Sequence, residues 1–309
     1  MPRINPPSPP VPDTTADDPR VGRLLGSRLG RNDAPAAILL GFPSDEGVRR
    51  NGGRVGAVQG PGALRAALYR LAPDARSSAF EELLCRTRDL GDLQITGDVE
   101  LDQRNLGEVL SPHLAHGSFV VVFGGGHETS YGHFLGYAVS RRPVEILNWD
   151  AHADVRELRD GKAHSGSPFR QALEDPSGAC RRYTAVGLEP HLVARAHLEL
   201  VERHGRAVWR SQISSGTIEA IYRDLEGPAL VSFDLDAVNQ AEAPGVSAPN
   251  AAGLRSELWL EAAYAAGRCP GVTSADVVEL NPVVDRDGQT ARLAALTVWW
   301  LLRGRAERP

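Results

Sequence analysis

Short apolar runs, each followed by a longer amphipathic segment, dominate this sequence from residue 36 onward. Runs of this length without polar alternation are typical of strands buried on both faces of a sheet. The runs are residues 37–41, 87–91, 119–124, 144–149, 183–187, 207–209, 229–234 and 275–280. The segments that predict helices include residues 61–71, 103–116, 189–205, 214–225, 255–268 and 290–303. This alternation predicts an α/β fold, a single three-layer α/β/α domain with a mainly parallel sheet of about eight strands.

The first twenty residues differ from the rest of the chain. They are rich in proline and polar residues, and they lack the apolar side chains that offset the entropy cost of folding. We therefore expect residues 1–20 to form a disordered Pro-rich tail. No Pro/Gly/Ser-rich linker divides the remainder, so we expect residues 21–309 to form one domain.

Charge and composition exclude several classes of partner. Lys and Arg total 34 against 39 Asp and Glu, a formal net charge of -5, so no basic surplus indicates nucleic acid or an anionic membrane as the partner. No apolar run approaches the ~20 residues of a membrane span, and the first twenty residues lack the apolar core of a secretory signal. The three cysteines predict neither a disulfide framework nor a Cys-rich zinc site. We expect a cytoplasmic protein that acts on a small molecule.

Four of the predicted strands end in side chains that can bind a cation. These residues are His127, Asp150, His152, Asp154, Asp234, Asp236 and Glu279. Because the carboxyl ends of parallel strands share one edge of the sheet, we expect these side chains to face the same crevice. Carboxylates at alternating positions would repel one another and lose hydration unless a cation neutralised them. The pattern therefore favours a metal site.

Each segment also has a structural interpretation. His127 can be a hydrogen-bonded turn residue, residues 150–154 a polar loop or the capped start of a helix, and Glu279 a surface or capping residue.

Oxygen-rich ligation with one imidazole per ion suits a hard or borderline ion such as Mn²⁺ better than a structural zinc. The four aspartates and two histidines are more ligands than one ion needs, which favours two metals that share a water or hydroxide.

The four strand ends together resemble the ureohydrolase family, the dimanganese enzymes that include arginase, agmatinase and formimidoylglutamase. The matching motifs are residues 124–127, 150–154, 232–236 and 279–282, in the family's order, and the resemblance covers residues 36–304. It implies an arginase-like fold and two Mn²⁺ per chain. The implied ligands are His127, Asp150, Asp154 and Asp234 for one ion, and Asp150, His152, Asp234 and Asp236 for the other.

The loops around these motifs are most similar to those of formimidoylglutamase, in residues 45–57, 154–156 and 165–170. Arginases and agmatinases have a histidine directly before the glycine of the last loop, where this sequence has Ser165 before Gly166 and places His164 one residue earlier. The resemblance implies that a metal-bridging hydroxide attacks the amidine carbon of N-formimino-L-glutamate, a step of histidine degradation that yields L-glutamate and formamide.

The resemblance also implies roles for individual side chains. Asp154 would transfer the proton to the departing amine, and Glu279 would hold the amidinium. A substrate with two carboxylates needs cationic or polar partners, for which the candidates are Asn51, Arg54, Arg156 and Ser165.

Three other functions remain open at this point: a ureohydrolase that releases urea from arginine, agmatine or a guanidino acid, a two-metal phosphoesterase, and a metal-binding protein without turnover. Family members commonly form trimers or larger rings, so the resemblance also implies a homo-oligomer.

Overall fold

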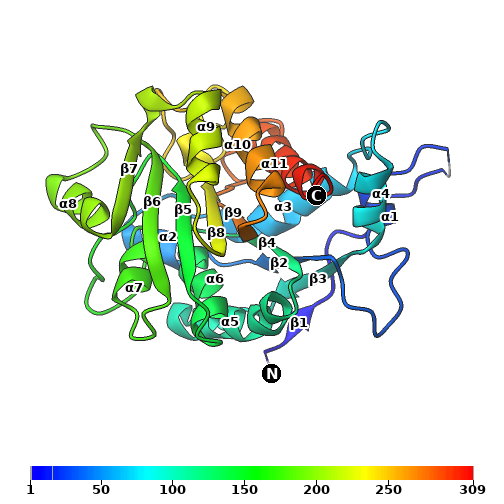
Figure 1. Ribbon diagram of the computed structural model, residues 1–309, viewed down its shortest axis with the longest axis horizontal. Coiled ribbons are helices and arrows are strands. Elements are labelled where there is room, and N and C mark those ends of the chain that lie inside the picture. The colour runs from blue at the N-terminus through cyan, green and yellow to red at the C-terminus, as the bar shows by residue number, and fades with distance from the viewer. Residues whose placement is uncertain (1, 16, 309) are drawn as a thin grey trace.

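A nine-stranded sheet runs through the centre of the protein (Figure 1). The computed structural model describes residues 2–15 and 17–308, so Met1 and Ala16 of the expected tail, and Pro309 of the expected domain, lie outside the described residues. The strands are β1 (Ile4–Asn5), β2 (Ala37–Phe42), β3 (Thr87–Leu93), β4 (Phe119–Gly124), β5 (Val144–Trp149), β6 (Cys180–Leu188), β7 (Gly205–Trp209), β8 (Ala229–Asp234) and β9 (Val272–Val278).

The strand order is β1-β3-β2-β4-β9-β8-β5-β6-β7. Only the β1–β3 pair among the described strands is antiparallel, and the other pairs are parallel. The predicted α/β class with a mainly parallel sheet is confirmed. Each of the eight predicted strands corresponds to one of β2 to β9, although β9 ends at Val278 rather than at residue 280. Glu279 has a φ of 66°, outside the extended region, and this backbone conformation ends the strand.

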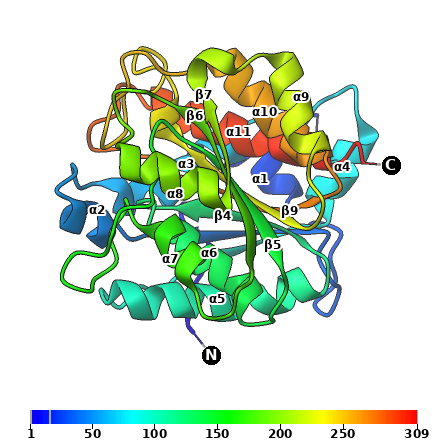
Figure 2. The same ribbon diagram turned by 60° about the vertical axis from the view of Figure 1, so that its left-hand side comes forward.

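Helices cover both faces of this sheet. They are α1 (Val21–Leu24), α2 (Glu46–Asn51), α3 (Gly60–Tyr69), α4 (Ser78–Cys85), α5 (Val99–Ala115), α6 (Thr129–Ala138), α7 (Pro168–Glu174), α8 (Arg195–His204), α9 (Ser215–Arg223), α10 (Ser256–Arg268) and α11 (Gln289–Arg305). Figure 2 shows α5, α6 and α7 on one side of the sheet and α9, α10 and α11 on the other. Within the described residues, no helix combines the length and the apolar character that crossing a membrane requires.

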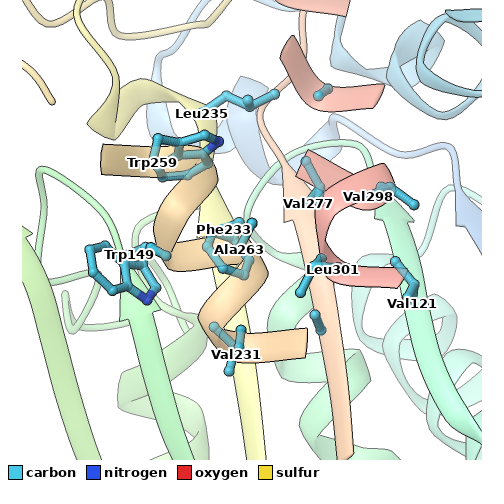
Figure 3. Close-up of a cluster of buried hydrophobic side chains, with 14 of the residues drawn as sticks. Val121, Trp149, Val231, Phe233, Leu235, Trp259, Ala263, Val277, Val298 and Leu301 are labelled. Carbon is cyan, nitrogen blue, oxygen red and sulfur yellow. The ribbon is translucent and has the colours of Figure 1, made fainter. Parts of the chain in front are cut away.

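Two hydrophobic cores result from the alternation of side chains along the strands. Ala37 and Leu39 of β2 belong to the core under α3, α9, α10 and α11, whereas Ile38 and Leu40 belong to the core under α5 to α8. Figure 3 shows part of the first core, where Trp259 of α10 packs beside the side chains of β8. Burial on both sheet faces explains why the strand sequences are continuously apolar.

The N-terminal segment has contacts with the domain. Ile4–Asn5 pairs with β3, and Arg65 of α3 donates a hydrogen bond to the carbonyl of Ser8 at 3.2 Å. Arg65 itself is fully buried and pairs with Asp89 at 2.9 Å. The sequence predicts no strand here because two residues among prolines carry no periodic pattern. The mobility of residues 1–20 stays a prediction, and their first part forms an edge strand.

Candidate metal centre

The candidate ligands lie at the carboxyl ends of four strands that are neighbours in the sheet, in the order β4, β9, β8 and β5. Asp150 directly follows β5, Asp234 is the last residue of β8, and Glu279 directly follows β9. His127 lies in the glycine-rich turn after β4. Because these strands are parallel and adjacent, their polar ends meet at one edge of the sheet.

Four of these residues surround one point. The Nδ1 atom of His127 lies 2.8 Å from Asp234 Oδ2, 2.9 Å from Asp154 Oδ2 and 3.5 Å from Asp150 Oδ2. All four residues can offer ligand atoms within 4.8 Å of one another. Three carboxylates and one imidazole around a common point form a donor set that suits a divalent cation such as Mn²⁺.

A second group adjoins the first. The Nδ1 atom of His152 lies 3.3 Å from Asp150 Oδ1 and 3.3 Å from Asp236 Oδ2. Asp150 belongs to both groups, because its Oδ2 faces His127 and its Oδ1 faces His152. Asp234 belongs only to the first group. The structure therefore brings together all six residues that the resemblance implies as ligands, with Asp150 between the two groups.

Hydrogen bonds behind His127 fix the orientation of its ring. Ser232 donates its hydroxyl proton to Asp276 Oδ1 at 2.6 Å, so the Ser232 oxygen can accept the Nε2–H of His127 at 3.0 Å. This arrangement leaves the lone pair of a neutral His127 on Nδ1, which faces the carboxylates and has no hydrogen-bond partner among the described residues. A buried ring nitrogen with a free lone pair is suited to bind a metal ion.

Two carboxylates of the centre, those of Asp234 and Asp236, lie where their ionised form is disfavoured in the absence of a bound cation. Burial, together with repulsion from Asp150, raises the pKa of Asp236 to about 7. Burial also raises the pKa of Asp234 well above its usual range, with repulsion from Asp236 and Asp150 adding to the effect. The centre therefore holds either protons or cations at neutral pH.

The pKa values of the two histidines are also raised, but by the neighbouring carboxylates and against the effect of burial. Burial acts to lower the pKa of His152, but the carboxylates of Asp236 and Asp150 outweigh it and raise that pKa to about 12. In the same way, Asp234 and Asp154 outweigh the burial of His127 and raise its pKa well above the usual range. Because histidine binds a metal as the neutral imidazole, these rings would have to lose a proton when a cation binds.

We therefore expect Mn²⁺ binding to release protons and to weaken as the pH falls. At neutral pH His152, with its pKa raised to about 12, carries an extra proton, and Asp236, with its pKa raised to about 7, is protonated in part of the molecules. Ligation requires the removal of these protons. Calorimetric titration with Mn²⁺ in two buffers of different ionisation enthalpy is expected to give about one released proton per ion. Affinity between pH 6 and pH 8 should rise with pH, and affinity independent of pH without proton release would contradict this electrostatic account.

A cavity of about 280 Å³ opens beside the candidate ligands. Its lining residues are Asn51, Gly52, Gly53, His152, Asp154, Arg156, Ser165, Asp234, Asp236, Ser247, Ala248 and Glu279. Three of the four predicted substrate contacts, Asn51, Arg156 and Ser165, therefore line it. Among the described residues of this lining, Arg156 is the only Lys or Arg.

Arg54 and His164 do not line this cavity. The Arg54 guanidinium donates hydrogen bonds to the carbonyls of Val246 and Ser247, so its side chain is tied to the loop that contributes Ser247 to the lining. His164 is buried, with its Nδ1 accepting from Gly166 N–H at 3.1 Å and its Nε2 donating to the Glu157 carbonyl at 2.9 Å. Both ring nitrogens of His164 are therefore hydrogen-bonded to backbone groups.

The Glu279 carboxylate is held in place from both sides. Its Oε1 accepts from His127 N–H at 2.8 Å, and its Oε2 accepts from the Ser247 hydroxyl at 2.7 Å. Glu279 and Asp154 both have positive φ angles, 66° and 45°, which are strained conformations for residues other than glycine. Ser247 was not predicted from the sequence, because its Pro/Gly-rich loop follows no strand and carries no motif.

Comparisons with known proteins show which family the chain is similar to. A formimidoylglutamase from Geobacillus thermodenitrificans is 38% identical over 271 residues, which cover 84% of this chain and 81% of that protein. One from Rhodococcus jostii is 38% identical over 284 residues, covering 84% and 83%. The crystal structure of Trypanosoma cruzi formiminoglutamase with Mn²⁺ matches with a TM-score of 0.87 at 31% identity, covering 95% of this chain and 100% of that one. The model of the Arginase family matches residues 35–303, and the chain belongs to this family.

Proposed function

We propose that this protein hydrolyses N-formimino-L-glutamate to L-glutamate and formamide, breaking a linear amidine C–N bond. The relatives at 38% identity are formimidoylglutamases. The observation that carries the proposal is the convergence of six carboxylate and imidazole ligands beside a cavity whose only Lys or Arg is Arg156. This arrangement supplies a hydrolytic centre at one end of the substrate and a carboxylate partner at the other.

Two Mn²⁺ ions fit the centre. One ion would be held by His127, Asp150, Asp154 and Asp234, and the other by Asp150, His152 and Asp236. When bound, the ions act as Lewis acids and lower the pKa of water to near neutrality. The crowded carboxylates would then be ionised, and the histidines would be neutral ligands.

Glu279 would bind the amidinium of the substrate. Its carboxylate lines the cavity and is oriented by Ser247 and by the backbone of His127. Burial raises the pKa of Glu279, which makes a cationic partner favourable for its ionised form. The positive formimino group is such a partner, and a charge-assisted hydrogen bond would hold it next to the ligands.

Asp154 would move the proton that the reaction requires. Water adds to the formimino carbon, and the bond from that carbon to the glutamate nitrogen breaks, so this nitrogen needs a proton. The Asp154 side chain lines the cavity and stays 11% exposed. Its carboxylate can therefore take a proton from the attacking water and give it to the departing amine.

Arg156 would bind a substrate carboxylate, with Asn51 and Ser165 beside it. The three side chains form one network, in which Arg156 donates to Asn51 Oδ1 at 3.2 Å and Asn51 donates to Ser165 Oγ at 3.1 Å. A planar guanidinium matches the geometry of a carboxylate. Arg54 would support this wall through its hydrogen bonds to the carbonyls of Val246 and Ser247.

We expect Arg156→Ala to raise KM for N-formimino-L-glutamate roughly 10–100-fold, because a hydrogen-bonded charge partner is lost. Mn²⁺ content should stay at the wild-type level, since Arg156 lies outside both ligand groups. Steady-state kinetics and metal analysis test this. Arg255→Ala is the matched control, because Arg255 is 72% exposed and pairs with the similarly exposed Glu257 on the surface. An unchanged KM in Arg156→Ala would show that the carboxylates bind elsewhere.

The proposed reaction is tested by giving the Mn²⁺-loaded protein N-formimino-L-glutamate, arginine, agmatine and a phosphomonoester in parallel. We expect formamide and glutamate from the first compound and no turnover of the others. Urea release would assign the protein to another branch of the family, and phosphate release would replace the proposal with a phosphoesterase. Full Mn²⁺ occupancy without turnover of any compound would leave only a metal-binding protein.

A cytoplasmic location and a homo-oligomeric state are also part of the proposal. All three cysteines, Cys85, Cys180 and Cys269, are free thiols, which is usual in a reducing compartment. Sedimentation of the purified full chain would give the oligomeric state.

A further inference from the structure

Glu128 is a fully buried carboxyl group next to the ligand His127, yet it belongs to neither ligand group and does not line the cavity. Its Oε1 accepts the N–H of Gly47 at 2.9 Å and the hydroxyl of Ser44 at 3.3 Å. Its Oε2 is buried without a hydrogen-bond partner among the described residues. The side chain thus points toward the segment that contains α2.

The chain is shaped closely around this carboxyl group. A Cβ atom at Gly47 would lie 2.5 Å from the Glu128 Cδ, and one at Gly126 would lie 2.2 Å from the Glu128 Oε2. Both distances are shorter than any tolerated contact, so these two glycines allow the backbone to approach the carboxyl group. Glu128 therefore fixes how closely α2 lies against the turn after β4.

Gly47 connects Glu128 to the cavity wall. While its N–H donates to Glu128, its carbonyl accepts the N–H of Ser165 at 3.1 Å. The Ser165 hydroxyl accepts from Asn51, and the Asn51 carbonyl oxygen accepts from Arg156. One continuous set of hydrogen bonds therefore links the buried carboxyl group to the three lining side chains opposite the candidate ligands.

We propose that Glu128 is a positioning residue for substrate binding, which holds α2 so that Asn51, Ser165 and Arg156 keep their places in the cavity wall. This inference rests on the proposed function. The other end of α2 is held independently, because Arg50 donates to Glu100 at 2.9 Å and to the Ala163 carbonyl at 3.0 Å. Loss of the Glu128 side chain would therefore displace the Gly47 end of α2 together with Ser165, whose N–H is bound to the Gly47 carbonyl. Through Ser165 it would disturb Asn51 and Arg156, which are hydrogen-bonded to Ser165 in series.

The test compares Glu128→Ala and Glu128→Gln with the wild-type protein, each loaded with Mn²⁺. We expect Glu128→Ala to raise KM roughly 10-fold, because the hydrogen bond that holds Gly47 is lost and the cavity wall with Arg156 shifts, with kcat within about threefold of wild type. Its affinity for the product L-glutamate, measured by calorimetry, should fall by a similar factor. Glu128→Gln keeps an oxygen that can accept the hydrogen bond from Gly47, so its KM should stay close to the wild-type value. Mn²⁺ content should equal that of wild type in both variants.

A second variant keeps the proposal testable if Glu128→Ala does not fold. Gly47→Ala places a methyl group against the same carboxyl group and should raise KM in the same way. Gly216→Ala is its control, because a Cβ there meets only Ser214 Oγ, at 3.9 Å. An unchanged KM in Glu128→Ala, or in Gly47→Ala where the first does not fold, overturns the inference. Loss of Mn²⁺ at unchanged KM would overturn it in favour of a role at the metals. Absence of wild-type turnover of N-formimino-L-glutamate refutes the proposed function instead.

Discussion

Replacing Glu279 with Gln is expected to lower kcat for N-formimino-L-glutamate by about 10²–10³-fold, the range found when one well-placed electrostatic group is lost. The amide has nearly the shape of the carboxylate, and it can still accept from His127 N–H while its NH₂ group faces Ser247. The geometry of the site is thus preserved, but the negative charge that faces the amidinium disappears. Steady-state kinetics and metal analysis of the same preparation measure the two effects separately.

The Mn²⁺ content of Glu279→Gln is the control within this experiment. Glu279 belongs to neither ligand group, so two ions per chain should remain. Glu257→Gln is the matched variant, because this glutamate is 79% exposed and should leave kcat unchanged. Loss of manganese from Glu279→Gln would assign the carboxylate to metal binding, and wild-type turnover would remove its role in holding the substrate.

Replacing Asp150 with Asn should have the largest effect on metal binding. Asp150 is the only residue shared by both groups, so one substitution removes negative charge from both. Loss of an outer hydrogen-bond partner of a ligand costs roughly 10–100-fold in metal affinity, and loss of a shared carboxylate should cost more. We expect fewer than two Mn²⁺ per chain and loss of the thermal stabilisation that Mn²⁺ gives to the wild-type protein.

Asp224→Asn is the comparison for this variant. The Asp224 side chain is 53% exposed, and its ion pair with Arg206 spans 3.8 Å. The Mn²⁺ content and the melting temperature of Asp224→Asn should therefore equal those of the wild-type protein. Asp150→Asn with two tightly bound ions and an undiminished Mn²⁺-dependent shift in Tm would contradict the placement of Asp150 between the groups.

The strands could be predicted from the sequence because burial on both faces requires continuous apolar runs. Helix α6 could not, since it is buried almost all around and therefore has no polar face. Gly107 of α5 lies against it, where a Cβ would be only 2.7 Å from Leu135 Cβ, so the two helices pack through small residues instead of a periodic apolar stripe. Strand β1 is set by its pairing with β3, a tertiary contact without a local signal.

The candidate ligands could be predicted because each follows an apolar strand, and parallel strands that are neighbours bring their ends together. Residues that act behind the ligands have no such signal. Asp276 lies within β9, and only the register of β9 with β8, where Ser232 faces Asp276, places it behind His127. Arg54 was predicted to contact the substrate, yet its guanidinium is hydrogen-bonded to the carbonyls of Val246 and Ser247. Val246 is 192 residues away along the chain, so the sequence near Arg54 carries no signal of this contact.

The most direct test is electron paramagnetic resonance of the Mn²⁺-titrated protein, combined with metal analysis. Because the two ligand groups share Asp150, the account predicts two ions per chain, close enough to give the spectrum of an exchange-coupled pair, as expected for ions ~3.5–4 Å apart. A single bound ion, or two ions with the spectrum of isolated Mn²⁺, would contradict it.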